Sequence, residues 1–149
     1  MNAIKYIEET DGLDDDTIIV THDAVRPFVS ARIIDENIEA ALQYGATDTV
    51  VPATDTIVES QNGTTISSIP DRSKLYQGQT PQAFKAKLLK ELYYSLTEDE
   101  KAILTDACKI FSMKGYDVHM IQGEVHNIKL TYPYDLRVAM ALLEDKEIK

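Results

Sequence analysis

The sequence has 149 residues, 44% of them hydrophobic and 27% charged, which are the proportions of one globular domain, residues 1–149, with its own core. A net charge of −10, without any cluster of lysine and arginine, argues against a surface that follows nucleic-acid phosphates. No apolar run reaches the roughly 20 residues that a membrane span needs. We therefore expect a cytoplasmic protein without nucleic-acid or membrane partners, whose single cysteine, Cys108, lies in the core.

The first third of the chain predicts a strand, a helix and a second strand. The β-branched run 17–21 predicts a buried parallel strand. Ser30 and Gly45 suit the two ends of the helix, because serine caps helix N-termini and glycine often follows the last helical turn. Residues 47–53 predict the second strand. This order favours an α/β fold with a parallel sheet.

The next segment predicts a protruding β-arm. Asn62-Gly63 is a strong signal for a tight turn between two β-prone stretches, 55–60 and 64–69. The stretches are rich in threonine and serine, and an isolated hairpin of this kind is marginally stable in water. We therefore expect an arm over residues 54–78 that packs against a second subunit in a homodimer.

The rest of the chain predicts four helices and two strands. The first helix is marked by Phe84, Leu88 and Leu92, and a short second helix follows the Thr97–Glu100 capping box. The third helix is expected over 106–114 with Thr105 as its cap. The fourth begins at Pro133 and has Leu136, Met140 and Leu143 on one face. The strands are expected over 117–122 and 127–131.

One candidate site directly follows the first predicted strand. Asp23 and Arg26 lie just past its carboxyl end, where ligands bind in open α/β sheets. Asp23 could hold substrate hydroxyls or a magnesium ion, and Arg26 could contact a phosphate. A salt-bridged turn without function is the alternative.

Three further residues could bind an anion. Arg72 lies on the arm, and Thr80 is held extended by the proline that follows it. Lys129 lies on a predicted strand, where alternation places it on the same face as Asn127 and Thr131, a reasonable phosphate site. A surface arginine, a helix-initiating threonine and a solvated lysine are the alternatives.

Thr105 precedes a predicted helix start that could hold an anion or a ribose, although a plain helix cap is the alternative. The three histidines, His22, His119 and His126, have no metal-ligand spacing. The chain has no phosphate-binding P-loop and no hydrolase nucleophile motif. Taken alone, these residues indicate an α/β domain that binds an anionic small molecule.

Four segments together resemble a known family. THDAVRPF at 21–28, IPDRSKLYQGQTPQAF at 69–84, TDACKIF at 105–111 and GEVHNIKLTYPYDL at 123–136 stand in the order found in cytidylyltransferases of the methylerythritol-phosphate and ribitol-phosphate type. The resemblance runs from about residue 3 to residue 144. It implies a three-layer αβα Rossmann-like nucleotidyltransferase fold, incomplete at the N-terminus, with a β-hairpin dimerisation arm.

The resemblance also implies roles for individual residues. Substrate binding would fall to Asp23, Arg26, Thr56, Thr80 and Thr105, and catalysis to Arg72 and Lys129. Lys129 would position the attacking phosphate, Thr56 and Arg72 would reach into the site of a dimer mate, and Thr105 would lie near the nucleotide. The reaction would transfer CMP from CTP, with Mg²⁺, to D-ribitol 5-phosphate, giving CDP-ribitol for teichoic-acid synthesis and pyrophosphate.

The choice of acceptor rests on details of these motifs. Tyr-Gln-Gly-Gln at 76–79, Ala-Cys-Lys-Ile at 107–110 and Tyr-Pro-Tyr-Asp-Leu at 132–136 resemble the ribitol-phosphate enzymes. The isoprenoid-pathway enzymes tend to carry a second acid after the Thr-Asp pair. 2-C-methyl-D-erythritol 4-phosphate as acceptor is the alternative, and a non-catalytic dimeric binding module is another.

One family segment has no counterpart here. Family members begin with a strand and a glycine-rich nucleotide loop, whereas residues 1–6 of this chain resemble the middle of the family sequence. We therefore expect this chain to lack the CTP cradle and to turn over CTP poorly by itself.

Overall fold

A four-stranded mixed sheet forms the centre of the computed structural model, which describes residues 1–144. Its strands stand in the order β1-β3-β2-β4 and are β1 (Ile18–Thr21), β2 (Ala46–Pro52), β3 (Tyr76–Lys85) and β4 (His119–Gln122). β3 runs antiparallel to both β1 and β2, whereas β2 and β4 are parallel. The predicted α/β class is confirmed, and the sheet is mixed rather than parallel throughout.

β3 was not predicted from the sequence, and its presence shows that two predictions were wrong. β1 pairs only with β3 among the described strands, so it is a half-exposed antiparallel edge strand instead of a buried parallel one. Phe84 lies near the end of β3, and the helix that it was expected to open begins at Ala86. The reason for the miss is that β3 contains Pro81 and three glutamines, although proline is rarely found in a central strand.

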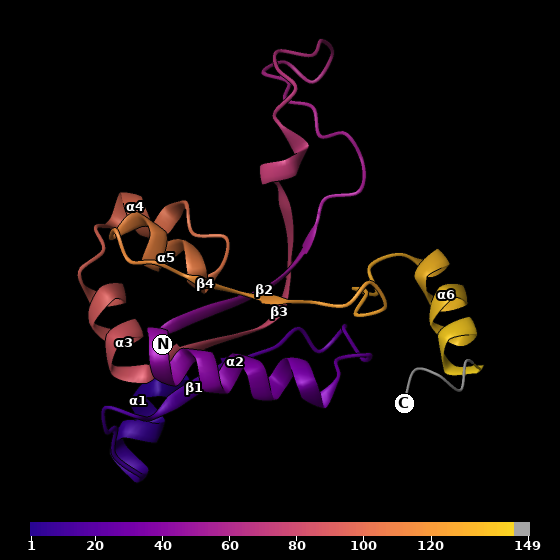
Figure 1. Cartoon of the computed structure of the whole chain (residues 1–149). Helices are drawn as coiled ribbons and strands as arrows, with labels where there is room; N and C mark the ends of the chain where they lie inside the picture. Colours follow the sequence, from indigo (N-terminus) through magenta and orange to yellow (C-terminus); the bar gives the residue numbers. More distant parts are fainter. Residues whose placement is uncertain (145–149) are drawn as a thin grey trace.

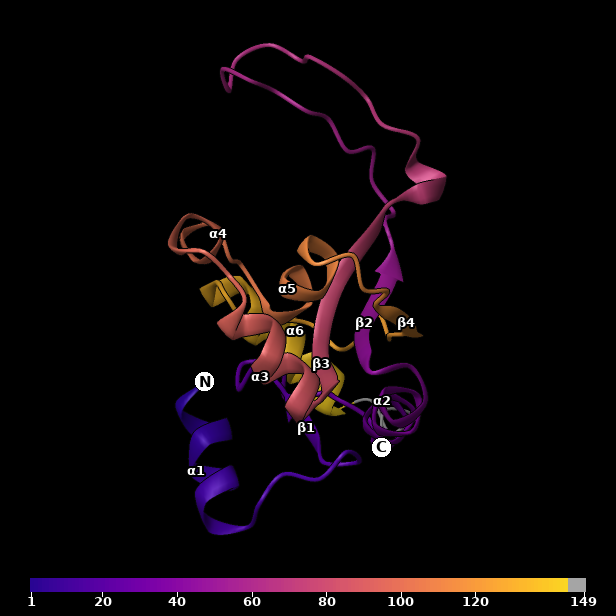
Figure 2. The ribbon, with the colours of Figure 1, turned by 90° about the vertical axis from the view of Figure 1, so that its left-hand side faces the viewer.

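The described residues form six α-helices, four of which cover the two faces of the sheet. They are α1 (Asn2–Thr10), α2 (Ala31–Tyr44), α3 (Ala86–Tyr94), α4 (Glu98–Ala102), α5 (Ala107–Met113) and α6 (Pro133–Glu144). α2 lies on one face, and α1, α3 and α5 lie on the other (Figure 2). The main apolar core belongs to the second face, where the rings of Phe84 and Phe111 stack 5.2 Å apart. This arrangement confirms the three-layer αβα fold.

The helix ends follow the capping signals closely. The Ser30 side chain accepts from the Ile33 amide at the start of α2, Gly45 ends that helix with a φ of 91°, and the Thr97 capping box is formed. One cap was wrong by a residue, because Asp106 caps α5 and Thr105 precedes it. An aspartate accepts a backbone hydrogen bond as well as a threonine does, so the sequence does not separate the two. Cys108 lies in the core as predicted.

The connection between β2 and β3 projects away from the sheet as an arm (Figure 1). Gly63, with a φ of 72°, makes the predicted turn, but the two stretches beside it form one bridge, Glu59 to Ser68, instead of two strands. The side chains of Ser60 and Asn62 bind the backbone of the turn and so compete with a regular ladder. A short 3₁₀ helix, η1 (Arg72–Lys74), leads into β3.

The carboxyl-terminal segment holds one correction and one confirmation. Residues 127–131 form no strand, because no strand lies beside them within residues 1–144; the Leu130 amide donates instead to the Val25 carbonyl in a loop. α6 begins at Pro133 as predicted and stands apart from the sheet (Figure 1). The face formed by Leu136, Met140 and Leu143 is exposed and lines a groove of 760 Å³ with the segment 27–30.

A buried polar seam joins α2 to the sheet. Asn37, which is fully buried, donates to the Thr49 hydroxyl at 2.9 Å and accepts from the Thr47 hydroxyl at 2.8 Å. The Thr49 hydroxyl in turn donates to the carbonyl of Pro81 at 2.6 Å. The seam therefore supplies hydrogen bonds at the point of the sheet where proline interrupts the ladder.

We predict that Asn37→Ala lowers the free energy of unfolding by about 2 kcal/mol, because it leaves buried threonine hydroxyls without their partner. Urea unfolding at neutral pH measures the change. Gln43→Ala, at an exposed position of the same helix, is the matched control and should change the free energy little. Equal losses in the two variants would show that the seam contributes nothing beyond helix propensity.

Candidate functional site

Three segments far apart in the sequence meet in a cleft of 470 Å³ at one end of the sheet. The first segment follows β1, the second lies within β3, and the third follows β4; Asp48 of β2 and residues 105–107 at the start of α5 complete the lining. The lining side chains are mostly polar and are Thr21, His22, Asp23, Arg26, Asp48, Gly78, Gln79, Thr80, Gln82, Thr105, Asp106, Ala107 and Lys129. The cleft thus brings together five of the seven predicted site residues, namely Asp23, Arg26, Thr80, Thr105 and Lys129.

Asp23 stands between two cations at one side of the cleft. Its Oδ2 atom lies 3.0 Å from Lys129 Nζ and 3.4 Å from Arg26 Nε. The hydrogen bond from Lys129, reinforced by its charge and by Arg26, holds the pKa of this carboxyl below its ordinary value although partial burial opposes the shift. Arg26 is nearly buried, whereas the Lys129 side chain is 49% exposed. Lys129 is therefore the cation with freedom to turn toward a ligand.

Thr80 and His22 fix the turn that carries Asp23. The Thr80 hydroxyl accepts from the Asp23 amide at 3.0 Å and lies 2.9 Å from His22 Nδ1. His22 Nε2 lies 3.0 Å from the carbonyl of Arg26, which can only accept. This pattern assigns the ring proton to Nε2 and makes Nδ1 the acceptor of the Thr80 hydroxyl. His22 therefore supports the turn through the Thr80 hydroxyl and the Arg26 backbone.

Asn127 connects all three segments of the cleft. It is fully buried, and its Nδ2 donates to the Thr80 carbonyl at 2.8 Å and to Gln79 Oε1 at 3.2 Å. Its own carbonyl accepts from Arg26 Nη1 at 2.8 Å. Strand alternation had placed Asn127 beside Lys129 on one face, and the structure instead turns it into the interior. The only signal of this role in the sequence was that Asn127 is a polar residue within the family segment at 123–136.

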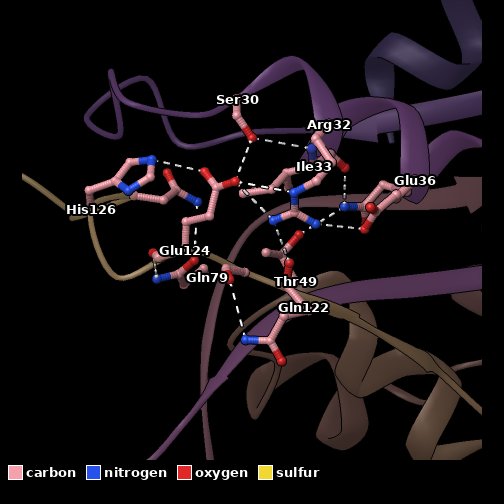
Figure 3. Close-up of polar contacts among 12 residues, drawn as sticks. Ser30, Arg32, Ile33, Glu36, Thr49, Gln79, Gln122, Glu124 and His126 are labelled. Carbon is pink, nitrogen blue, oxygen red and sulfur yellow. Dashed lines mark hydrogen bonds and ion pairs between the residues drawn. The ribbon is translucent and has the colours of Figure 1, made fainter. Parts of the chain in front are cut away.

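A second network attaches the third segment to α2. Figure 3 shows Glu124 at its centre, with one carboxylate oxygen accepting from Ser30 Oγ at 3.0 Å and from Arg32 Nη2 at 2.9 Å. His126 Nε2 lies 2.9 Å from the other oxygen. Burial opposes the charge of Glu124, but the hydrogen bonds from Arg32 and Ser30 outweigh it and lower the pKa. No pattern in the sequence indicated this network.

A further polar group lines the same cleft. Asp48 Oδ1 accepts from Gln82 Nε2 at 3.0 Å, and Thr105 and Asp106 lie beside them at the start of α5. Burial raises the pKa of the Asp48 carboxyl, and the nearby charge of Asp106 adds to the shift. Asp48 and Gln82 were not expected from the sequence, because a predicted strand offers no signal for which of its polar residues line a cleft.

Two predicted site residues lie elsewhere in the chain. Thr56 and Arg72 are exposed on the arm, and Arg72 Nη1 donates to the carbonyl of Thr54 at 2.8 Å. The described chain therefore does not bring them to its own cleft. Their contact with the site of a second subunit stays a prediction.

Asp23 is the residue to consider for magnesium. Within residues 1–144, no three histidine, cysteine, aspartate or glutamate side chains are grouped to hold a metal ion. Magnesium is usually held by one or two carboxylates together with substrate phosphates. Because Lys129 and Arg26 both contact Asp23 Oδ2, this carboxylate fits as one ligand at most, with phosphates supplying the others.

We predict that Asn127→Ala weakens binding of inorganic phosphate to the cleft and lowers the free energy of unfolding by about 2 kcal/mol, since the Thr80 carbonyl loses its buried donor. Calorimetry measures the first effect and urea unfolding the second. Asn2→Ala, at an exposed position of α1, is the control. Wild-type phosphate affinity in Asn127→Ala would contradict the connecting role.

The comparisons with known proteins cover nearly all of the chain. The family model described as IspD, 2-C-methyl-D-erythritol 4-phosphate cytidylyltransferase, matches residues 1–145.

None of the helices in residues 1–144 combines the length and the apolar character needed to cross a bilayer.

Solved structures agree with the family match. The 2-C-methyl-D-erythritol 4-phosphate cytidylyltransferase of Thermus thermophilus is 32% identical, with a TM-score of 0.74, over 86% of this chain and 62% of its own. The 4-diphosphocytidyl-2C-methyl-D-erythritol synthase of Anaerococcus prevotii is 30% identical, with a TM-score of 0.80, over 96% and 63%. The Francisella tularensis enzyme, 23% identical with a TM-score of 0.81, shares the fold over 93% of this chain and 65% of its own. This chain thus spans less than two thirds of each of these structures, and it belongs to the 2-C-methyl-D-erythritol 4-phosphate cytidylyltransferase family.

Proposed function

We propose that this chain forms the acceptor-binding part of a cytidylyltransferase that transfers CMP from CTP to a sugar-alcohol phosphate. The observation that carries the proposal is the pairing of Arg26 and Lys129 around Asp23 in a polar cleft, in a member of this family. The two cations suit a phosphate, and the other hydrogen-bonding side chains of the cleft suit hydroxyl groups.

The chemistry needs positioning more than covalent help. An oxygen of the acceptor phosphate attacks the α-phosphorus of CTP, a new phosphorus–oxygen bond forms, and the bond to pyrophosphate breaks. Both reactants are negatively charged, so cations must hold them close and in line. Lys129 turns from Asp23 to the acceptor phosphate, Arg26 stays fixed by the Asn127 carbonyl, and Asp23 is left to accept from acceptor hydroxyls. Magnesium bound to the triphosphate, with Asp23 as one ligand, would neutralise further charge.

The acceptor that the comparisons support is 2-C-methyl-D-erythritol 4-phosphate, which the family description and the solved structures name. D-ribitol 5-phosphate, the acceptor first expected from the motif wording, is not supported by those names. One observation keeps it as the second candidate. Ala107 lines the cleft directly after Thr105 and Asp106. At this position the similar enzymes of the isoprenoid pathway tend to carry an acid.

We predict that Lys129→Met lowers the affinity for the acceptor phosphate by tenfold or more, because a charge-assisted hydrogen bond contributes about 1.5–3 kcal/mol. Calorimetry with each of the two sugar-alcohol phosphates measures the affinity and identifies the acceptor. Lys87→Met removes another lysine that pairs with an aspartate, Asp15 at 2.7 Å, and should change nothing.

The outcomes separate the candidate functions. Binding of one sugar-alcohol phosphate, lost in Lys129→Met, supports the acceptor site and names its ligand. If neither compound binds while the chain assembles with itself, the cleft has no acceptor role and a non-catalytic binding module is favoured.

We further propose that two chains form a homodimer through the arm, in which Thr56 and Arg72 of each reach the cleft of the other. The arm supports this because Val58, Ile66 and Ile69 expose large apolar side chains along it, and exposed apolar groups gathered on a projection favour association. In the described chain Arg72 is bound to its own arm and its side chain is exposed, so a second subunit can reach it.

We predict that the double variant Ile66→Asp and Ile69→Asp converts a dimer into a monomer, since the new charges cannot be buried without partners. Light scattering coupled to gel filtration measures the mass. Gln61→Asp, at the exposed tip of the arm, is the control for added charge. A monomeric wild-type chain would refute the arm's role.

A further inference from the structure

The polar floor of the cleft is continuous with the apolar core. On the sheet face covered by α3 and α5, Ala46 pairs with Phe84 in the core. Two residues further along β2, Asp48 pairs with Gln82, and Gln82 also pairs with Thr21 on β1. Residues paired across a sheet project to the same side, so Asp48, Gln82 and Thr21 form a row on the face that carries the core. This row lines the cleft where the helices end.

Asp48 is a carboxylate without a cation. Its Oδ1 accepts from Gln82 Nε2, and no lysine or arginine in residues 1–144 forms an ion pair with it. Its Oδ2 lies beside Gly78, 3.7 Å from where a Cβ would stand, and both residues line the cleft. Burial, with the charge of Asp106, raises the pKa of this carboxyl even though Gln82 and the Thr49 backbone donate hydrogen bonds to it. An ionised carboxylate in such a place is unfavourable unless something donates hydrogen bonds to it.

The position of Asp48 suggests what the donor is. Arg26 and Lys129 occupy the same cleft and suit the phosphate of the acceptor, which leaves its carbon chain with the hydroxyl groups for the floor. A hydroxyl group donates without bringing a charge, so it satisfies Oδ2 at little desolvation cost. A metal ion suits the place less, because no third carboxylate or histidine in residues 1–144 joins Asp48 and Asp106.

We propose that Asp48 determines specificity for the sugar-alcohol chain of the acceptor, by accepting a hydrogen bond from one of its hydroxyl groups while Gln82 holds the carboxylate in place. The inference rests on the proposed acceptor site and adds to it a residue that reads the polyol rather than the phosphate. A site built to bind a hydroxyl strongly rejects an analogue that lacks it, because the buried acceptor is then left unpaired.

The test compares Asp48→Asn with wild type in calorimetric titrations of D-ribitol 5-phosphate, 2-C-methyl-D-erythritol 4-phosphate and inorganic phosphate. Asparagine has the same shape and can keep the bond from Gln82, but it loses the charge and one acceptor oxygen. We expect the affinity for the bound sugar-alcohol phosphate to fall at least tenfold and that for inorganic phosphate to stay unchanged. Asp35→Asn, at an exposed position of α2 on the opposite face of the sheet, is the control and should bind both as wild type does.

Each other outcome overturns one of the two proposals. Equal affinity of wild type and Asp48→Asn for the sugar-alcohol phosphate would refute the role of Asp48 and leave the acceptor site standing. Equal losses for the sugar-alcohol phosphate and inorganic phosphate would also refute it, since the substitution would then act on the phosphate end. Failure of wild type to bind either sugar-alcohol phosphate would refute the acceptor site itself. Should Asp48→Asn not unfold cooperatively near the wild-type Tm, Asp48→Ser takes its place in the same comparison.

Discussion

The hydrogen bonds of Asn127 are the constraint on which the cleft depends. A single buried amide and the carbonyl of the same residue join the turn after β1, the middle of β3 and the loop after β4. The turn and the loop are not held there by a sheet ladder, because residues 22–26 and 127–131 form no strand. A fully buried amide is costly unless its donors are used, so the native arrangement is favoured over ones that separate the segments. Asn127 thus holds Arg26 and the loop after β4 against Thr80, which the ladder of β3 keeps in place.

The charges of the cleft are arranged for exchange rather than for stability. Asp23 satisfies both Arg26 and Lys129, but exposed ion pairs contribute at most about 1 kcal/mol, so the Lys129 pair is easily broken. Arg26 is nearly buried and is also bound to the Asn127 carbonyl, so it stays in place when Lys129 leaves. An arriving phosphate would therefore replace a weak contact of Lys129 and meet a fixed arginine. This division between a fixed and a movable cation suits a site that must bind and release a charged substrate.

The sequence was sufficient where local signals decide the structure and insufficient where distant residues do. The caps at Ser30 and Gly45 and the turn at Gly63 depend on near neighbours, and all three were predicted. β3 was missed because Pro81 is normally a strand breaker, and its tolerance here depends on Thr49 and Asn37, which are distant in the sequence. The site motifs pointed to Asp23, Arg26, Thr80 and Lys129 through their position beside turns, a proline and strand ends. The roles of Asp48 and Glu124 follow from tertiary contacts, in the cleft and with α2, which the local sequence does not indicate.

The arm carries an arginine, and the cleft has fewer cations than its proposed substrates need. The described cleft offers two cations and several carboxylates, whereas an acceptor phosphate and a triphosphate together carry far more negative charge than Arg26 and Lys129 neutralise. The arm holds Arg72 away from its own cleft, on a projection whose apolar side chains favour association. If a second chain supplies that guanidinium, the cation that completes the site arrives only upon assembly. Dimer formation would then set the electrostatics of the cleft, and a chain with an intact fold but no partner would bind the phosphate end of its substrate weakly.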